Sequence, residues 1–341
     1  MRHYCCYFDH RYAPRALAMI RSLRQFEPDA PIWVLCLNED CHRIMTAVAE
    51  PGVRLISMAQ FEAGDASLSA ARHNRSLIEY YFTCTPSLVR FVLQRCGERD
   101  SVTYVDGDLY FFSTPLCLHE ELGDQSVSLI PHRFPEGQRQ REIYGLYNVG
   151  WLTFRNDPDG LAVVSWWRDR CNEWCYDRLD GERFADQKYL DRVPSIFRGV
   201  RVLQNPGANV APWNLGRYQL RRAGTQIQVS DGAPLVFFHF HGIKSATSWC
   251  YILGLRQYGA ELDKVTRHDL YRPYLTLVAD IDRSLRGRTD TAVSTGNAAL
   301  LQRDGQQNAR RSWRDVLRPI VRSVRATLHR DALVVIAGRV I

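Results

Sequence analysis

The first sixty residues alternate between short apolar runs and amphipathic stretches, and this alternation restricts the possible folds more than any other feature. Residues 3–8, 32–37 and 53–56 are apolar runs of strand length. Between them, Tyr12–Phe26 places apolar residues at helical intervals, and residues 38–48 begin with an asparagine suited to cap a second helix. Strands that alternate with helices predict a mostly parallel sheet joined by right-handed crossovers. The sequence therefore predicts an α/β fold.

A pair of carboxylates follows a further predicted strand, Val102–Val105. Asp106 and Asp108 flank a glycine, and an aromatic run resumes directly after them. Burying an isolated carboxylate is very costly, so these side chains need a cation, hydrogen-bond donors or water. Ligands of open α/β sheets bind at the carboxyl ends of strands, and alternate residues of an extended segment point to the same side. The two carboxylates can thus converge on one hard divalent metal ion, although a simple polar turn is the alternative.

The second half of the chain continues the same pattern. Strands are predicted at 127–131, 147–154 and 234–240, and an aromatic helix at 160–179. The segment 131–145 is rich in Arg, Glu, Gln and Gly, which predicts a loop that orders around a ligand. We therefore expect one α/β domain to extend over residues 1–282.

The charge is concentrated at the end of the chain. The formal net charge is +7, but residues 310–341 carry eight arginines and two acids. The remainder holds 36 basic and 35 acidic residues, a net charge of +1. Residues 283–309 are rich in Ser, Thr, Gly, Gln and Asn, a composition typical of a linker. The basic character thus belongs to a separate tail at 310–341.

The tail has the pattern of a basic amphipathic helix. From Trp313 to Leu328, apolar residues recur every three to four positions, and arginines fill most of the rest. Such a helix suits an anionic membrane surface, although docking on the domain or on another subunit is the alternative. Nucleic acid is not expected as a partner, because one side of the helix is too apolar and the body of the chain is nearly neutral.

Composition and cysteine placement indicate a reducing compartment. With 45% hydrophobic and 24% charged residues, the chain resembles ordinary soluble globular proteins. The ten cysteines lie mostly in apolar, periodic segments and form no CxxC pair, a pattern typical of buried, reduced thiols. The N-terminus enters a strand directly, so no secretory signal is expected. We expect a cytoplasmic protein, peripheral at the inner face of the cytoplasmic membrane if the tail binds lipid.

Several short motifs occur in a characteristic order. Phe8-Asp-His-Arg-Tyr opens the first strand–helix turn, and Arg90 stands one helix before Asp106-Gly-Asp108. Asn148-Val-Gly begins a strand, Asp186-Gln187 a helix, and His239-Phe-His-Gly ends the last strand. Over about residues 3–250, this set resembles nucleotide-sugar glycosyltransferases of GT-A type. It is most similar to the retaining family that contains glycogenin and the lipopolysaccharide galactosyltransferases, in particular to bacterial glycan-assembly members. The resemblance implies a Rossmann-like, mostly parallel mixed sheet flanked by helices, followed here by the amphipathic C-terminal helix.

The resemblance also implies roles for individual residues in donor binding. Asp9 and Tyr12 match positions that hold the nucleotide base and ribose, although both also suit a helix N-terminal turn. Arg90 matches an arginine that contacts the donor, with a plain surface charge as the alternative. Asn148 matches an asparagine that touches the donor sugar. Asp186 and Gln187 match a catalytic pair near the anomeric carbon, and an N-terminal helix cap is the simpler role for Asp186.

The implied metal site consists of Asp106, Asp108 and His239, with Mn²⁺ or Mg²⁺ as the cofactor. His241 can replace His239, because residues i and i+2 share one strand face. The remaining residues implied for the diphosphate are Gly242, which lets backbone approach it, and Lys244. The sequence departs from the family here, since the lysine comes one residue early and Ser245-Ala246 replaces the usual Pro-Trp.

The resemblance thus implies a metal-dependent enzyme that transfers a sugar from a nucleotide diphosphate, with a UDP-sugar favoured, to a glycan or lipid-linked acceptor. No second carboxylate is clearly placed as a general base, which fits retaining transfer. Bacterial surface polysaccharide assembly is the expected setting. The alternative from a different class is a non-catalytic glycan- or nucleotide-binding protein with a degenerate transferase fold.

Overall fold

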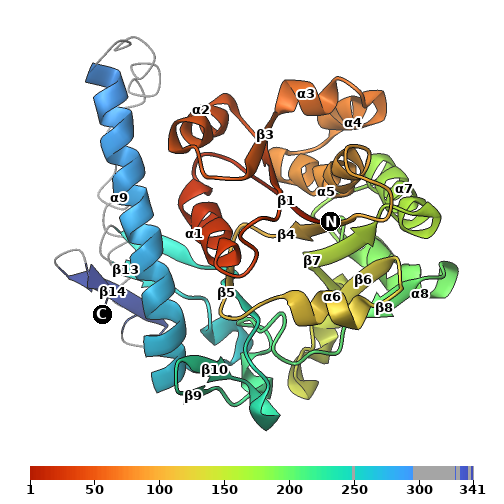
Figure 1. Ribbon diagram of the computed structural model, residues 1–341. Helices are drawn as coiled ribbons and strands as arrows, with labels where there is room; N and C mark the ends of the chain where they lie inside the picture. Colours follow the sequence, from red (N-terminus) through yellow and green to blue (C-terminus); the bar gives the residue numbers. More distant parts are fainter. Residues whose placement is uncertain (248–249, 295–326, 328–330, 337–338, 341) are drawn as a thin grey trace.

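A computed structural model describes residues 1–247, 250–294, 327, 331–336 and 339–340. Its centre is a seven-stranded sheet with the strand order β3-β2-β1-β4-β7-β6-β8 (Figure 1). Four of the six neighbouring pairs are parallel, and only β7 runs against its two neighbours. The predicted α/β class with a mostly parallel mixed sheet is therefore confirmed.

The central sheet is formed by β1 (Arg2–Phe8), β2 (Ile32–Cys36), β3 (Val53–Ser57), β4 (Ser101–Val105), β6 (Val127–Pro131), β7 (Tyr147–Arg155) and β8 (Val200–Val202). The smaller sheets contain β5 (Leu109–Phe111), β9 (Arg221–Ala223), β10 (Gln226–Gln228), β11 (Phe237–His239), β12 (Lys244–Thr247), β13 (Cys250–Ile252), β14 (Ala332–Ile336) and β15 (Arg339–Val340). The α-helices are α1 (Ala13–Arg24), α2 (Glu39–Val48), α3 (Met58–Glu62), α4 (Ala66–Ala71), α5 (Leu77–Leu93), α6 (Leu116–Leu122), α7 (Pro158–Glu173), α8 (Val193–Ile196) and α9 (Arg272–Ser294). Short 3₁₀ segments include η2 (Glu136–Tyr144), η3 (Lys188–Arg192) and η6 (Arg256–Tyr258), and a π-helical turn, η7 (Thr266–Tyr271), leads into α9.

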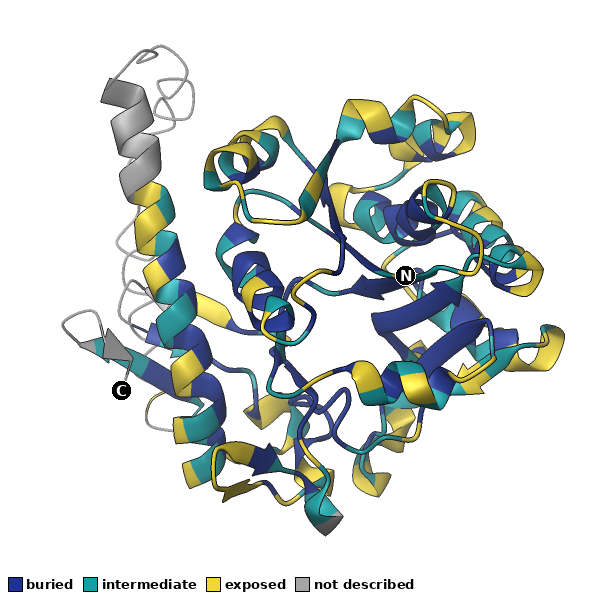
Figure 2. Ribbon diagram, in the orientation of Figure 1, coloured by how far each residue is buried: buried dark blue, intermediate teal, exposed yellow. Residues whose placement is uncertain are grey.

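Two hydrophobic layers cover the two faces of the central sheet. Alternate side chains of a strand point to opposite faces, and β1 shows this clearly. Tyr4 and Cys6 pack into the layer built with α1, α2 and α9, whereas Cys5 joins the layer built with α3, α5 and α7. The inner strands β1, β2, β4, β6 and β7 are almost entirely buried, whereas the edge strands β3 and β8 are partly exposed (Figure 2). The sheet is therefore a rigid support for whatever lies at its edges.

The strand order reverses direction at β1, and this places a crevice at one end of the sheet. The chain passes from β1 to β2 and β3 on one side, and then returns to the other side of β1 as β4. Such a switch point leaves room for a ligand beyond the carboxyl ends of the two strands. Asp9 follows β1 there, and Asp106 follows β4. The topology therefore brings the two segments singled out in the sequence together.

A two-stranded antiparallel sheet extends this end of the molecule. β11 pairs with β5, so that His239 lies opposite Leu109. Because the β-strand period is two, Phe238 and Phe240 point into the core while His239 and His241 face the same cavity as Asp108. This pairing explains how residues about 130 positions apart in the sequence meet.

The C-terminal region differs from the prediction where the structure describes it. α9 continues to Ser294, so the first residues of the expected linker at 283–309 are helical, and the rest of that linker lies outside the described residues. The helix predicted over 310–341 is wrong for 332–336, which form strand β14 against β13 (Figure 1). The run Ala-Leu-Val-Val-Ile in β14 has high strand propensity and finds an antiparallel partner. The predicted amphipathic stretch Trp313–Leu328 lies outside the described residues, apart from residue 327.

Other predicted elements are largely confirmed. All ten cysteines are free, as expected from their placement. The segment 62–75 contains the short helix α4, capped by the Asp65 side chain. In α5, Pro86 lies inside the helix. In the described part of the chain, no helix combines the length and the apolarity needed to span a membrane.

Candidate active site

A cavity of about 690 Å³ lies beyond the carboxyl ends of β1 and β4. Its wall includes seven of the side chains predicted for a site, from four separate segments of the chain: Asp9, Tyr12, Asp106, Asp108, Asn148, Asp186 and Gln187. His239 and His241 complete this set. The structure therefore brings nine of the twelve predicted residues to one cavity.

Asp106, Asp108 and His239 form the centre of the cavity. The His239 Nε2 lies 3.0 Å from Asp108 Oδ1 and 3.6 Å from Asp106 Oδ2. Asp108, His239 and His241 each place a ligand atom within 4.8 Å of the others. Carboxylate oxygens and imidazole nitrogens together suit divalent ions such as Mn²⁺. The residues therefore fit the predicted metal.

Hydrogen bonds from two tyrosines orient the carboxylates. The Tyr12 hydroxyl donates to Asp108 Oδ2 at 2.7 Å, and the Tyr104 hydroxyl donates to Asp106 Oδ1 at 2.9 Å. A Cβ added at Gly107 would lie 3.3 Å from the Tyr12 ring, so the glycine allows this ring to lie against the Asp-Gly-Asp segment. Tyr104 precedes Asp106 by two residues and shares its face, a signal that sequence reasoning missed.

The charges of this cluster depend on one another. Burial alone would raise the pKa of Asp108, but the charge of His239 and the hydrogen bonds from His239 and Tyr12 hold that pKa well below its usual range. Burial raises the pKa of Asp106, and Asp108 adds to this effect while His239 opposes it. Burial lowers the pKa of His239, yet the two carboxylates raise it overall. Two adjacent carboxylates in one cavity thus favour a positive charge beside them, and the raised pKa of His239 reflects this preference.

Gly150 leaves the space that the His239 ring occupies. A Cβ at this position would lie 2.8 Å from His239 Cε1, 2.9 Å from His239 Nδ1 and 2.7 Å from Asn148 Oδ1. We expect Gly150→Ala to displace the ring, to lower the free energy of unfolding by about 1–3 kcal/mol and to weaken Mn²⁺ binding, as measured by urea unfolding and a Mn²⁺ titration. Gly64→Ala is the control, because nothing lies within 4 Å of a Cβ there. Equal Mn²⁺ affinity in the two variants would contradict this role of Gly150.

Asp186 lies on another wall of the cavity and has a different environment. Burial raises its pKa to about 7, with the nearby Asp106 charge adding to the effect and a hydrogen bond from Thr85 opposing it. Its backbone carbonyl accepts a 2.7 Å hydrogen bond from the Trp167 indole. Ala185, directly before it, has a φ of 46°, a strained value for a residue with a side chain. Tertiary contacts therefore impose a local conformation that presents Asp186 to the cavity.

Hydrogen bonds to nearby residues of the same chain fix the side chains of Gln187 and Asn148. The Gln187 amide donates to the Tyr144 carbonyl at 3.1 Å. The Asn148 amide lies 3.3 Å from His132 Nε2, and its oxygen accepts from the Gly150 N–H at 3.1 Å. Both side chains thus line the cavity in fixed orientations.

Asp9 and Tyr12 have structural roles in addition to lining the cavity. The Asp9 carboxylate accepts from the backbone N–H groups of Arg11 and Tyr12 at 3.0 and 3.1 Å. It therefore stabilises the turn before α1, which is the simpler alternative considered for it. Their predicted contacts with base and ribose remain predictions.

Three residues predicted for the donor do not line the cavity. α5 presents Ile78, Tyr81 and Phe82 to it, and Arg90 lies more than two turns further along the helix, where its charge acts on Asp65. Gly242 has a φ of 78° and turns the chain away after His241. Lys244, which is itself exposed, consequently begins strand β12 in a different sheet.

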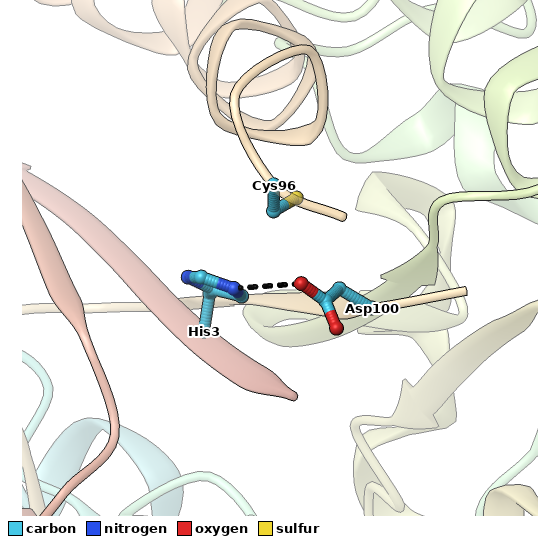
Figure 3. Close-up of side chains that lie close together, drawn as sticks. All are labelled: His3, Cys96 and Asp100. Carbon is cyan, nitrogen blue, oxygen red and sulfur yellow. Dashed lines mark hydrogen bonds and ion pairs between the residues drawn. The ribbon is translucent and has the colours of Figure 1, made fainter. Parts of the chain in front are cut away.

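A second group of metal-binding residue types lies at the opposite, amino end of β1 and β4. His3, Cys96 and Asp100 place ligand atoms within 4.8 Å of one another (Figure 3). However, His3 Nδ1 accepts a hydrogen bond from the Trp33 indole at 3.3 Å, and an indole only donates. The proton of neutral His3 is therefore on Nε2, which lies 3.2 Å from Asp100 Oδ2. Burial raises the pKa of the Cys96 thiol to about 11, and the hydrogen bonds with Trp33 and Asp100 account for His3, so we interpret this cluster as a hydrogen-bonded packing element.

Comparison with solved structures finds glycosyltransferases at low sequence identity. The galactosyltransferase LgtC, solved in complex with donor and acceptor sugar analogs, is 18% identical with a TM-score of 0.45, over 82% of this chain and 96% of LgtC. The apo form of the glycosyltransferase GlyE from Streptococcus pneumoniae TIGR4 is 16% identical with a TM-score of 0.48, over 86% of this chain and 64% of GlyE. No family model matches the sequence.

Sequence comparison finds nearer relatives in Bacillus subtilis (strain 168). The uncharacterized protein YfnD is 28% identical over 276 residues, which cover 80% of this chain and 87% of YfnD. The uncharacterized protein YfnF is 33% identical over 249 residues, which cover 71% of this chain and 81% of YfnF. With this identity over most of both chains, the protein belongs to the same family as YfnF.

Proposed function

We propose that the protein is a metal-dependent glycosyltransferase of GT-A type that transfers a sugar from a nucleotide diphosphate to an acceptor hydroxyl. The observation that carries this proposal is the convergence of Asp106, Asp108 and His239 in one cavity, with Asp186 on another wall. The cavity is the size of a small-molecule site and lies at the switch point of the sheet. The order of motifs along the chain independently resembles such enzymes.

The proposed reaction exchanges one glycosidic bond for another. The bond between the anomeric carbon and the diphosphate oxygen breaks, and its electron pair stays on the phosphate. The acceptor oxygen bonds to the anomeric carbon, and its proton passes to the departing phosphate. This is the retaining course that we favour, because no further carboxylate is placed as a base.

The residues of the cavity have distinct parts in this scheme. Asp106, Asp108 and His239 would hold a Mn²⁺ or Mg²⁺ ion, which as a Lewis acid supplies positive charge to the leaving diphosphate. Asp186 orients the sugar hydroxyls and stabilises the electron-poor anomeric carbon, with Gln187 beside it. Asn148 contacts the donor sugar, and Asp9 and Tyr12 contact the nucleoside. We favour UDP as the nucleotide.

An apolar rim at the cavity supports an acceptor with an apolar part. Among the described residues, nine large apolar side chains are exposed, and five of them lie on two segments beside the cavity: Leu77, Ile78, Ile143, Tyr144 and Leu146. Two of these, Ile78 and Tyr144, line the cavity itself. Exposed apolar patches mark binding surfaces. We therefore favour a lipid-linked over a free glycan acceptor, in the assembly of a bacterial surface polysaccharide.

The proposed location is the cytoplasmic side of the membrane, with the segment 310–341 as the contact to anionic lipid. Most of that segment lies outside the described residues, so the support is the arginine-rich pattern of the sequence. Recovery of the full chain in the membrane fraction, compared with a full-length chain that carries Arg314→Gln, Arg318→Gln and Arg322→Gln, tests this location and keeps strand β14 in place. Equal recovery of the two chains would remove the support.

The first experiment is a thermal-unfolding measurement with Mn²⁺ and a panel of nucleoside diphosphates. At a ligand concentration of ~100 times Kd, binding should add roughly 2.7 kcal/mol to the free energy of unfolding. We expect one nucleotide to give such a shift with Mn²⁺ and to lose it with EDTA. No shift with any nucleotide would instead favour a binding protein that has lost the transferase activity.

A further inference from the structure

The cavity has an imbalance of charge that the residues discussed so far do not resolve. Four carboxylates line it: Asp9, Asp106, Asp108 and Asp186. Among the lining residues, all of which belong to the described chain, Arg141 is the one lysine or arginine. A nucleotide diphosphate would bring further negative charge into this space. One divalent metal ion neutralises only part of this negative charge, so the position of Arg141 in the cavity wall is significant.

Arg141 lies on η2, within the segment expected to order around a ligand. Its guanidinium donates a 2.8 Å hydrogen bond to the Gln257 carbonyl and lies 4.7 Å from the centre of the Tyr258 ring. The Gln138 side chain donates to the Tyr258 carbonyl and further connects η2 with η6. Among the described residues, no carboxylate forms an ion pair with Arg141. The Arg141 guanidinium is therefore fixed in position, and no carboxylate among the described residues neutralises its positive charge.

A series of ring contacts leads from Arg141 to the metal-binding cluster. The Tyr258 ring is centred 6.5 Å from His241, and His241 is centred 6.0 Å from His239. His239 in turn lies 3.0 Å from Asp108. Tyr258, His241 and Arg141 all line the cavity, so a diphosphate held through a metal ion at Asp106 and Asp108 would share one cavity with the guanidinium.

We infer that Arg141 binds the diphosphate of the donor, in the role first expected of Lys244. This inference rests on the proposed function. Guanidinium groups suit phosphate because they offer several N–H donors in a planar fork, and only one carbonyl contact occupies that of Arg141. Lys244 is exposed on β12 and does not line the cavity. The sequence departs from the family pattern around Lys244. Arg141, on the separate segment η2, supplies the positive charge that the lysine was expected to provide.

The test compares Arg141→Ala with a matched variant on the same segment. Arg139 lies two residues away, is 71% exposed and forms a 3.9 Å ion pair with Glu142, so Arg139→Ala removes an equal charge from outside the cavity. Calorimetric titration measures binding of the nucleoside diphosphate that stabilises the wild type, and of the corresponding nucleoside, both with Mn²⁺. We expect Arg141→Ala to weaken diphosphate binding by about 10- to 100-fold and to leave nucleoside binding unchanged. Arg139→Ala should match the wild type, and Arg141→Lys should retain part of the affinity.

The outcomes separate this inference from the proposed function. If the wild type binds the diphosphate and Arg141→Ala binds it equally well, the inference is wrong and the proposed function stands. If Arg141→Ala weakens the nucleoside as much as the diphosphate, Arg141 only supports the contact of η2 with η6, and the inference is again wrong. If the wild type binds no nucleoside diphosphate, the proposed function fails and the inference fails with it.

Discussion

Replacement of Asp108 by asparagine is expected to abolish the stabilisation of the protein by Mn²⁺ and nucleoside diphosphate. Asp108 contacts His239 at 3.0 Å and Tyr12 at 2.7 Å, so it is the carboxylate most tightly built into the cluster. The substitution keeps the shape of the side chain but removes a negative charge that a divalent ion requires. We expect the Mn²⁺ affinity to fall by more than about 100-fold, since an ion-pair partner in a buried site contributes several kcal/mol. In thermal unfolding, Mn²⁺ and the nucleoside diphosphate would then no longer add roughly 2.7 kcal/mol to the free energy of unfolding.

A matched control uses the second cluster of metal-binding residue types. Cys96→Ser changes a member of the His3–Cys96–Asp100 group, in which the proton of neutral His3 occupies the nitrogen nearest Asp100. If the cavity cluster is the metal site, Cys96→Ser retains the full Mn²⁺ response. A response that survives in Asp108→Asn but disappears in Cys96→Ser would place the metal at the other end of the sheet and contradict the proposal.

The sequence predicts the central part of the fold because local patterns and topology agree there. The apolar runs and helical patterns of residues 3–56 define β1, β2 and β3 with their helices. The end of the chain is different, because the strand character of residues 332–336 depends on pairing with β13, about eighty residues earlier. A pattern read along one segment contains no information on such a partner.

The candidate site was predictable where its residues follow strands. Asp106, Asp108 and His239 come from strand ends, and the alternation of strand side chains makes their convergence foreseeable. Arg141 was not predictable, because its approach to the cavity depends on contacts between η2 and the distant residues Gln257 and Tyr258. The position of Lys244 outside the cavity was not predictable for a similar reason, because the turn at Gly242 directs the chain into another sheet.

Replacement of Asp186 by asparagine is expected to slow sugar transfer strongly while stabilising the protein at alkaline pH. The carboxylate lies in the cavity, nine-tenths or more of it is inaccessible to solvent, and burial raises its pKa to about 7. In the proposed reaction Asp186 stabilises the anomeric carbon, and loss of one such interaction lowers kcat by about 10²- to 10³-fold. Release of nucleoside diphosphate from the donor would measure this loss. Binding of donor and Mn²⁺ should stay near the wild-type level, because Asp186 is not a metal ligand.

The effect on stability follows from the direction of the pKa shift. The carboxyl has its ordinary pKa of 3.8 in the unfolded chain and about 7 in the folded protein. Between these values the unfolded chain has released the proton and the folded protein keeps it, so the free energy of unfolding falls as the pH rises. Below about pH 4 the group has no effect, and above about pH 7 the full cost, roughly 4 kcal/mol at most, is present. Asparagine carries no titrating proton and avoids this cost.

The measurement is the difference in free energy of unfolding between Asp186→Asn and the wild type, by urea titration with EDTA at several pH values. We expect the difference to be small near pH 4, to grow in favour of the variant through pH 5 and 6, and to level off above pH 7. Asp65→Asn is a useful comparison outside the cavity wall, since the Asp65 carboxylate accepts hydrogen bonds from Arg168 and from the backbone N–H of Leu68, both at 2.9 Å. Burial alone would raise the pKa of Asp65, but these partners lower it overall, so that variant should lose stability rather than gain it. A difference for Asp186→Asn that is independent of pH would contradict the raised pKa of this carboxyl.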